Sequence, residues 1–306
     1  MNILSSQQIK NWALEIGFSH CGIAPAHSLD SAKLQFERSI EEGYHAEMHF
    51  LERDVEKRFD PEQLLSHCQS VIVVALDYRI AEQPQSDRYR TARFTWVEDY
   101  HVLVKDALTL LVEKIQQILP EAHCRITVDS SCISEKQWAA EAGVGCYGKN
   151  GLIHNSSGSF FVLGTVLADF QVDSYDKPMF SDCADCRLCV EYCPANALSD
   201  PYRVDARRCY AYHTIENKNP DNEVLANAPR VFGCDACQEI CPKNKKNDLK
   251  SPKILKSSLF LRLQNREVEN LTKEAFLSNF GNTAIARRKY ERFQKAIAAK
   301  MTDIQE

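Results

Sequence analysis

Eight cysteines carry the strongest chemical signal in this 306-residue chain. They open as Cys183-Ala-Asp-Cys186-Arg-Leu-Cys189-Val-Glu-Tyr-Cys193-Pro194, continue through Cys209 and close as Cys234-Asp-Ala-Cys237-Gln-Glu-Ile-Cys241-Pro242. Two residues between cysteines let a tight loop direct three thiolates at one face of a four-iron cluster, and the cysteine before proline ligates the other cluster in two-cluster ferredoxins. The spacing therefore predicts two 4Fe-4S clusters.

The same rule divides the eight thiolates into two ligand sets. The first cluster takes Cys183, Cys186, Cys189 and Cys241, and the second takes Cys193, Cys209, Cys234 and Cys237. A zinc site or a disulfide framework is the alternative. Zinc sites usually pair C-x2-C motifs and close with four ligands, and disulfide frameworks belong to small secreted domains, so both fit this pattern less well.

Composition limits the classes of function that remain. The net charge of -5 argues against a general nucleic-acid coat, although a local basic patch stays compatible with it. The N-terminus lacks a basic start followed by an apolar run, and the strongest apolar run, 71–76, is too short to cross a bilayer. We expect a cytoplasmic protein without a membrane span, in which the other five cysteines are small buried residues: Cys21, Cys68, Cys124, Cys132 and Cys146.

Hydrophobic patterning predicts strands that alternate with helices. We expect strands at 21–25, 71–76, 125–128 and 158–167, and helices at 5–16, 31–42, 45–53, 101–118 and around Trp138. The predicted class is α+β. An N-terminal α/β sheet domain at 1–172 precedes a ferredoxin-like two-cluster domain at 173–248, and a basic linker with a short helical tail follows at 249–306.

Two polar stretches next to the predicted strands have competing interpretations. Asp129-Ser130-Ser131 follows a buried strand and is either a cap of the helix around Trp138 or part of a site. Gly143-Val-Gly145-Cys-Tyr-Gly148-Lys149-Asn150 lacks the spacing of a phosphate-binding loop. We interpret this second stretch as a backbone bend that allows close approach of a partner or ligand.

Basic residues gather after the last cysteine. They form a linker and the outer face of a final helix, on which Ala286, Tyr290, Phe293 and Ile297 face inward. This face is either simply solvated or a phosphate-contacting surface for nucleic acid. The residues are Lys243, Lys245, Lys246, Lys250, Lys253, Lys256, Arg287, Arg288, Lys289, Arg292, Lys295 and Lys300.

Several stretches together resemble the epoxyqueuosine reductase family over nearly the whole chain. Ferredoxins share the cysteines but not Asp129 or the turn at 145–150. The stretches are Glu56-Lys-Arg58-Phe-Asp-Pro61, Asp99-Tyr100-His101, Val128-Asp129-Ser130, Ala142-Gly-Val-Gly145, Gly148-Lys149-Asn150, Gly158-Ser-Phe-Phe, Tyr202-Arg-Val-Asp-Ala-Arg-Arg-Cys209, Thr214-Ile-Glu216 and Phe232-Gly-Cys-Asp-Ala-Cys-Gln-Glu-Ile-Cys-Pro242.

The resemblance implies a base-off cobalamin between the N-terminal domain and the cluster domain. An external electron donor and the clusters would reduce it, and the substrate would be epoxyqueuosine in a tRNA anticodon loop. Asp129 matches the family's proton donor, and desolvation would raise its pKa above the usual value of about 3.9. By the same resemblance Arg58, Asp129, Ile153 and Gly164 line the corrinoid, the last two through backbone.

The chain departs from the family pattern at Cys132, Cys146, Ala211, His213 and Lys243, where members commonly have Pro, Trp, Ser, Leu and Trp. It also lacks the C-terminal helical repeats of longer members, so we expect part of their tRNA-binding surface to be absent. One alternative is a corrinoid iron-sulfur reductase acting on another substrate. Another is a plain ferredoxin-type electron carrier, which leaves the N-terminal domain and Asp129 without a role.

Overall fold

A four-stranded antiparallel sheet organises the N-terminal half in this computed structural model, which describes residues 4–129, 131–198, 202–245 and 252–302. The strand order is β1-β2-β6-β3, so β2 and β6 lie in the centre. The strands are β1 (His20–Pro25), β2 (Ser70–Asp77), β3 (Cys124–Thr127) and β6 (Phe161–Ala168).

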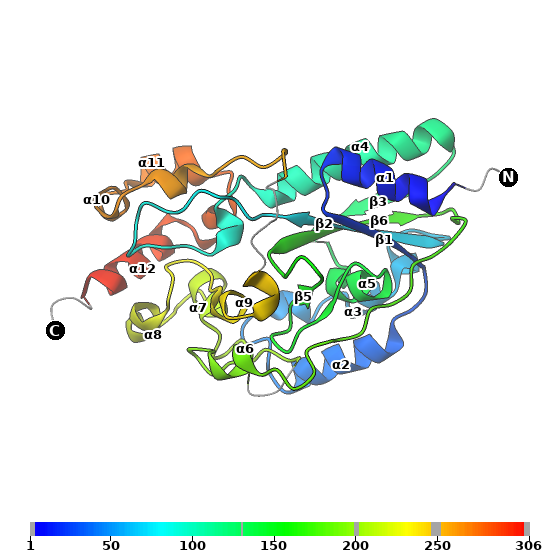
Figure 1. Ribbon diagram of the computed structural model, residues 1–306. Coiled ribbons are helices and arrows are strands. Elements are labelled where there is room, and N and C mark those ends of the chain that lie inside the picture. The colour runs from blue at the N-terminus through cyan, green and yellow to red at the C-terminus, as the bar shows by residue number, and fades with distance from the viewer. Residues whose placement is uncertain (1–3, 130, 199–201, 246–251, 303–306) are drawn as a thin grey trace.

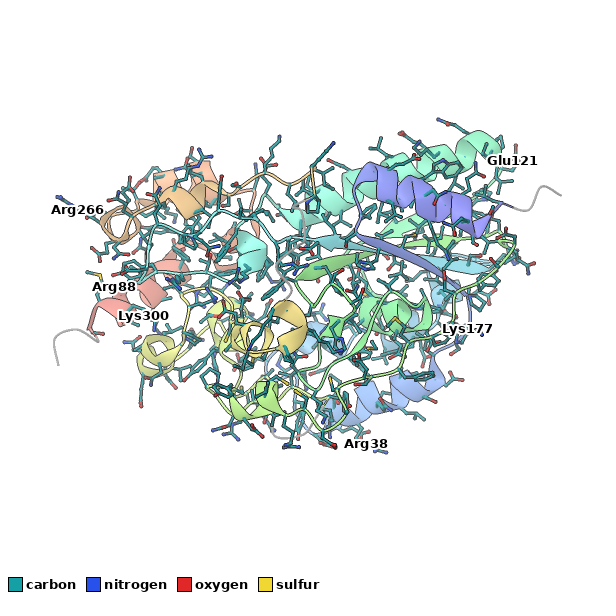
Figure 2. All side chains as sticks on the ribbon, in the orientation of Figure 1. Arg38, Arg88, Glu121, Lys177, Arg266 and Lys300 are labelled. Carbon is teal, nitrogen blue, oxygen red and sulfur yellow. The ribbon has the colours of Figure 1, made fainter. Side chains whose placement is uncertain are left out.

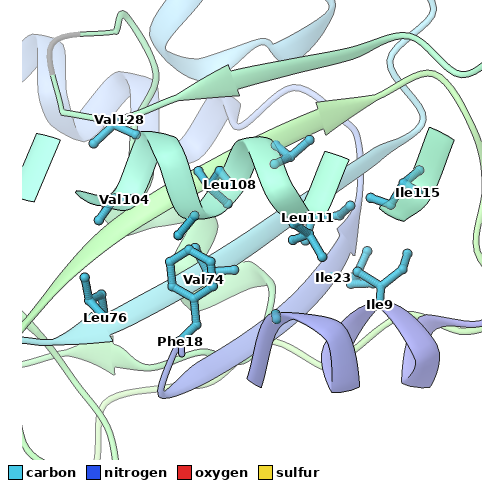
Figure 3. Close-up of a cluster of buried hydrophobic side chains, with 14 of the residues drawn as sticks. Ile9, Phe18, Ile23, Val74, Leu76, Val104, Leu108, Leu111, Ile115 and Val128 are labelled. Carbon is cyan, nitrogen blue, oxygen red and sulfur yellow. The ribbon is translucent and has the colours of Figure 1, made fainter. Parts of the chain in front are cut away.

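Two helices, α1 (Ser6–Ile16) and α4 (Tyr100–Ile118), cover one face of the sheet (Figure 1). Their apolar side chains pack against every second residue of the central strands. Figure 3 shows Ile9 and Phe18 below the sheet residue Val74, with Leu108 and Leu111 of α4 beside it. This cluster anchors α4, and the first turn of α4 reaches the site described below.

The opposite face of the sheet is covered by α5 (Glu135–Glu141), α2 (Asp30–Glu41) and α3 (Val55–Phe59). Trp138 is fully buried there and packs in one cluster with Val71, Val73 and Leu167. Because both faces of β2 are buried, all eight of its residues are buried, and the strand forms a continuous apolar run rather than an alternating one.

The cluster segment lies beside this sheet and consists of short helices. Before it, β4 (Cys146–Tyr147) and β5 (Ile153–His154) form a small hairpin. The helix α6 packs against α9, which brings together the two cysteine runs. The helices are α6 (Leu188–Glu191), α7 (Tyr210–Ile215), α8 (Asn222–Asn227) and α9 (Ala236–Glu239).

The C-terminal segment adds α10 (Asn265–Glu269), α11 (Lys273–Phe280) and α12 (Tyr290–Thr302). Its aromatic core includes Phe276 and Phe293, but also Tyr89 from the range expected to be the N-terminal domain. Short 3-10 helices span His49–Leu51, Pro61–Gln63, Arg93–Thr95, Pro242–Lys245, Leu259–Arg262 and Ala284–Arg288. Among the described helices, none is both long and apolar enough to cross a membrane.

The mixed α and β architecture is confirmed, and one predicted helix is wrong. The range 45–53 holds only a 3-10 turn, because Ala46 has a φ of +53° that interrupts a right-handed helix. The expectation that all five remaining cysteines are buried is also wrong. Cys146 is buried, whereas Cys21, Cys68, Cys124 and Cys132 are partly exposed.

The basic tail folds differently from the prediction. Arg287, Arg288 and Lys289 precede α12, and a φ of +60° at Lys289 separates the two helices. Arg288 is fully buried and donates to the His213 carbonyl at 3.0 Å. Similar bonds run from Arg292 to the Glu216 and Asn217 carbonyls, from Lys295 to Pro220 and from Lys300 to Ala226.

Most of these cations therefore hold the segment from α7 to α8 in place. Arg287, Lys289, Lys295 and Lys256 remain exposed, and their contact with nucleic-acid phosphates stays a prediction. Of the predicted linker residues, Lys246 and Lys250 lie outside the described residues. Other charged side chains are spread over the surface, with Arg88, Arg266 and Lys300 at the α10–α12 end and Lys177 at the other (Figure 2).

Close packing of α4 on β6 generates a stability prediction. A Cβ at Gly164 would lie 2.5 Å from Val104 Cγ1 and 3.0 Å from Leu108 Cδ1. Val104 is stiff in a helix, so Gly164→Ala should destabilise the protein by about 1–3 kcal/mol through overpacking. Urea unfolding measures this cost. The cost should shrink in a Val104→Ala background, and an equal cost in both backgrounds would contradict this packing.

Candidate active site

Asp129 lies just beyond β3, at a left-handed backbone position with a φ of +45°. Its Oδ2 accepts a hydrogen bond from Tyr100 Oη at 2.6 Å and lies 2.8 Å from His101 Nε2. Its backbone N–H donates to Glu135 Oε1 at 3.0 Å. Three contacts from two helices thus hold a non-glycine residue in a strained conformation, a combination typical of functional sites.

The alternative that Asp129 caps the helix around Trp138 is wrong. That helix, α5, begins at Glu135, and its N-cap residue is Ser134. Ser131 also precedes the cap position, and Ser130 lies outside the described residues. The contact runs the other way, because the side chain of Glu135 holds the backbone of Asp129.

The first turn of α4 positions His101 between two carboxylates. Asp99 is the N-cap of α4 and accepts from the His101 backbone N–H at 2.9 Å. The same Oδ1 lies 2.6 Å from His101 Nδ1, while Nε2 faces Asp129. Hydrogen bonds to Asp129 and Asp99 raise the pKa of His101 to about 9, so the imidazole is doubly protonated at neutral pH.

The pKa of Asp129 moves in the opposite direction from the sequence expectation. The hydrogen bond from His101 lowers the pKa of this carboxyl and outweighs its partial burial. The side chain is 54% exposed, and its free surface faces a cavity. Desolvation is therefore too weak to keep the carboxyl protonated, and the proton resides on the imidazole.

Two further ionisable groups lie beside Asp129. Burial raises the pKa of Glu135 to about 8, and burial lowers the pKa of Lys136. Lys136 Nζ donates to the Gly151 carbonyl at 3.0 Å, and the side chain borders the same cavity. Sequence reasoning assigned no role to Tyr100, His101, Glu135 or Lys136. For Tyr100 and His101, the sequence feature that could have indicated a role is their position at the start of α4.

A cavity of about 830 Å³ opens in front of Asp129. Arg58 and Tyr147 line it from the N-terminal half, and Glu216 and Arg287 line it from the cluster and C-terminal segments. A second cavity of about 350 Å³ shares Tyr100, Asp129, Glu135 and Lys136 with it and also touches Ile153, Ala211 and Cys234. The two cavities thus form a cleft between the sheet and the cluster segment.

The predicted corrinoid-lining residues differ in their placement. Arg58 borders the larger cavity and donates from Nη2 to the Phe50 carbonyl at 2.9 Å, while its buried Nε has no partner among the described residues. Ile153 is buried and borders the smaller cavity. Gly164 is not among the residues lining either cavity, and its missing Cβ points at α4.

The cysteines of the cluster segment lie close to one another, mostly within the predicted ligand sets, and the assignment of each thiol to a cluster stays a prediction. Burial and the neighbouring thiols of Cys183, Cys241 and Cys186 raise the pKa of Cys189. Burial together with Cys234 and Cys209 raises the pKa of Cys237, and Cys193 lies close enough to affect Cys209. None of the thirteen cysteines, all of which are described, is joined in a disulfide.

The glycine-rich turn joins the sheet domain to this segment. Cβ atoms at Gly145 and Gly148 would lie 2.5 Å from Ile153 Cγ2 and 2.8 Å from Asn150 Oδ1, so the close approach is within the turn and its hairpin. Lys149 Nζ donates to the Ala184 carbonyl at 2.5 Å, beside Cys183. The bend therefore supports the first cysteine loop rather than a nucleotide.

The departures from the family pattern fall in four places. Ala211 borders the smaller cavity. Cys132 lies 3.9 Å from Asp54 Oδ2, and His213 Nε2 lies 2.9 Å from the Arg207 carbonyl. Cys146 and Lys243 come together beside Cys183, where both approach Asp182.

Comparison with known families gives two matches. Residues 182–244 match the family described as "4Fe-4S double cluster binding domain". Residues 58–130, which include Arg58 and Asp129, match the family described as "Epoxyqueuosine reductase QueG, DUF1730".

Relatives match over most of the chain. The chain is 35% identical over 296 residues to an epoxyqueuosine reductase of Leadbetterella byssophila, covering 96% of this chain and 97% of that protein. It is 36% identical over 253 residues to the epoxyqueuosine reductase of Escherichia coli K12, covering 80% of this chain and 66% of that protein.

Solved structures show the same similarity. An epoxyqueuosine reductase bound to an epoxyqueuosine-modified tRNA-Tyr stem loop superimposes with a TM-score of 0.84 at 26% identity, over 96% of this chain and 80% of that one. The reductive dehalogenase NpRdhA superimposes with a TM-score of 0.52 at 15% identity, over 97% of this chain and 36% of that one. This second likeness concerns the fold alone.

The grouping of the thiols predicts that one cysteine controls one cluster. In Cys209→Ala the second set loses a ligand, so the anaerobically reconstituted protein should hold about four irons instead of about eight. Iron and sulfide analysis measures this change, and the electron paramagnetic resonance signal of the first cluster should persist. Replacing the partly exposed Cys68 with Ala is the matched control and should leave the iron content unchanged. A Cys209→Ala protein with full iron would contradict the second ligand set.

Proposed function

Since this chain belongs to the epoxyqueuosine reductase family, we propose that it reduces epoxyqueuosine to queuosine in tRNA. The observation that carries the proposal is the Asp129 carboxylate, paired with a protonated His101 and facing a cleft that a cysteine of the second ligand set also borders. A proton source and an electron source thus face one space. A tRNA substrate implies that the reaction takes place in the cytoplasm.

The relatives support the substrate. Proteins with at least 35% identity over nearly the whole chain are named epoxyqueuosine reductase, and a similar structure contains the modified tRNA stem loop. The cleft opens past Arg287 and Phe50, whose side chains lie 6.0 Å apart from guanidinium carbon to ring centre. An anticodon loop would insert its modified base through this opening.

Two 4Fe-4S clusters and a base-off cobalamin are the cofactors we assign. Arg58, Asp129 and Ile153 would hold the corrinoid, because they border the joined cavities and because the buried Arg58 Nε has an unused donor. Gly164 would contribute only indirectly, by letting α4 pack closely on the sheet. When bound, the corrinoid supplies the low-potential reductant for cleaving the C–O bonds.

In domain terms, residues 1–172 would form the corrinoid-binding domain, 173–248 the two-cluster domain and 249–306 a supporting tail. An external donor would supply the electrons. The smaller cavity at Asp129 touches Cys234 of the second ligand set. The second cluster would therefore be the one next to the corrinoid.

The residues around Asp129 would handle the protons. Conversion of the epoxide to an alkene takes two electrons and two protons, and the oxygen leaves as water. His101 holds one proton at Nε2, next to Asp129 Oδ2, and both side chains border the cavity. Asp129 would take this proton from His101 and pass it to the departing oxygen. Glu135, with a pKa of about 8, would hold a second proton next to it.

The proposal is tested with anaerobically purified protein that carries clusters and cobalamin, supplied with a chemical reductant and tRNA containing epoxyqueuosine. Mass spectrometry of the digested tRNA should show queuosine formed in proportion to enzyme. Loaded protein that binds cobalamin but leaves epoxyqueuosine intact would favour a reductase for another substrate. Protein with clusters that never retains cobalamin would favour a ferredoxin-type carrier.

Removing the carboxylate that relays the proton should abolish most turnover. Asp129→Asn keeps the shape and can still accept the hydrogen bonds, but an amide cannot take up a proton and pass it on, so the single-turnover rate should fall by roughly 10² to 10⁴. Cluster content and cobalamin binding should persist. Cys132→Ala, on the same loop but outside both cavities, is the control and should keep the parental rate. A near-parental rate in Asp129→Asn would remove this carboxylate from the reaction.

The pKa of His101 predicts the pH dependence. Its folded pKa of about 9 lies above the ordinary value of 6.5, so the imidazolium that supplies the proton persists through neutral pH and is lost as pH rises through about 9. Turnover should therefore fall above about pH 9. The same pairing stabilises the fold fully below pH 6.5, and this contribution disappears as pH rises through about 9. His101→Gln should remove both dependences, and an unchanged alkaline limb in this variant would refute the assignment.

Exposed lysines near the site should contribute to tRNA affinity. The Lys256 carbonyl accepts from the Glu98 backbone N–H at 3.0 Å, so the exposed Lys256 side chain lies beside the segment that leads to Asp99. Lys256→Glu should weaken tRNA binding and reduce its salt dependence by about one released counterion. Filter binding at several salt concentrations measures both. Lys177→Glu, at the far end of the molecule, is the charge-matched control. Equal slopes in the two variants would exclude Lys256 from the interface.

A further inference from the structure

A buried polar group lies against the first cysteine of the first ligand set. His154 Nε2 is 3.7 Å from Cys183 Sγ and 3.8 Å from Cys146 Sγ, and Cys146 Sγ is 3.9 Å from His154 Nδ1. Cys146 is 1% exposed and His154 4% exposed. Asp182 Oδ1 lies 3.5 Å from His154 Nε2, and its other oxygen pairs with Lys243.

This group is held rigidly and lies outside the two cavities at Asp129. Cys146 and His154 are direct partners across the β4–β5 hairpin. The next residue, Asn155, donates from Nδ2 to the Val144 carbonyl at 3.0 Å and closes a turn with Gly158. Two of its members, Cys146 and Lys243, are positions where this chain departs from the family pattern.

Hydrogen-bonding capacity sets the direction of the contacts. A neutral imidazole has one N–H donor and one acceptor nitrogen, and a thiolate that ligates iron can only accept. The donor is therefore Nε2 toward Cys183, and Nδ1 is the acceptor for the Cys146 S–H. The ion pair with Lys243 engages Asp182 on its other oxygen, which weakens Asp182 as a competing acceptor for the imidazole.

We propose that His154 is a positioning residue for the first 4Fe-4S cluster, to which it donates an N–H···S hydrogen bond at Cys183 and whose reduction potential it thereby raises. Hydrogen bonds to cluster sulfurs stabilise the more negative, reduced state. The smaller cavity at Asp129 touches Cys234 of the second set, so external electrons enter at the first cluster. His154 therefore adjusts how readily the enzyme accepts an electron.

The same side chains do not suit a separate zinc ion as well. Tetrahedral zinc holds its sulfur, nitrogen and oxygen donors about 3.3–3.6 Å apart, whereas Cys146, His154 and Asp182 place them 3.5–3.9 Å apart. The Lys243 ammonium already neutralises Asp182, and Cys183 is needed by the cluster. The test below includes a zinc measurement, so that a bound zinc ion would be detected.

The test compares His154→Leu with His154→Gln in the anaerobic two-cluster protein. Leucine removes the donor, while the glutamine amide can place an N–H close to the position of the imidazole Nε2. Redox titration followed by electron paramagnetic resonance should show a negative shift of the first-cluster potential in His154→Leu and recovery in His154→Gln. The second-cluster potential should stay constant. Double-resonance spectra should show an exchangeable proton at the first cluster in the parent and the Gln variant only.

Further variants keep the proposal testable if His154→Leu fails to assemble its first cluster. Cys146→Ala leaves the N–H···S bond in place and should shift the first-cluster potential less than His154→Leu does. If His154→Leu assembles no first cluster, Cys146→Ala should still show the exchangeable proton. Three outcomes would overturn the proposal. The first-cluster potential could be equal in the parent and His154→Leu, or the exchangeable proton could be lost in Cys146→Ala. The parent could also hold one zinc ion per chain that His154→Leu removes. The readout needs neither tRNA nor cobalamin. A protein that shows these shifts yet leaves epoxyqueuosine unreduced would refute the proposed function alone.

Discussion

The pairing of the Asp129 carboxylate with His101 and Tyr100 is the interaction on which the site depends. It joins the loop after β3 to the first turn of α4 across 28 residues of sequence. The loop can hold its positive φ only because both helices contact it, α4 through the side chain and α5 through the backbone. The closely packed sheet fixes where the two meet, since α4 lies on β6 at Gly164.

Electrostatics then assigns the proton to the imidazole rather than to the carboxyl. Asp99 and Asp129 flank His101 and favour its charged form, and the imidazolium in turn keeps Asp129 ionised. A carboxylate that passes on a proton held by its neighbour does not need a raised pKa of its own. The C-terminal cations have a separate task, because Arg288 holds a carbonyl within α7 and Arg292 and Lys295 hold carbonyls that follow it.

Cysteine spacing was sufficient to predict the double-cluster segment, because cluster geometry restricts sequence separation directly. The buried strand at 71–76 was equally readable from its apolar run. The pKa of Asp129 was not, since its main cause is a side chain from a helix distant in sequence. The burial of Arg288 was missed because its guanidinium donates to a carbonyl of α7, and the sequence around Arg288 does not reveal that contact. The same limit applies to Cys146 and His154, whose partners Asp182 and Lys243 come from other segments.

The most direct test of this account is the protonation state of His101, measured by nuclear magnetic resonance titration of protein with isotope-labelled histidine. Comparison with His101→Gln assigns the signal, and Asp129→Asn removes the acidic partner at Nε2. The account predicts that His101 titrates near pH 9 in the parent and at a clearly lower pH in Asp129→Asn. A His101 that titrates near its ordinary pKa of 6.5 in the parent, or that ignores the Asp129 substitution, would contradict it.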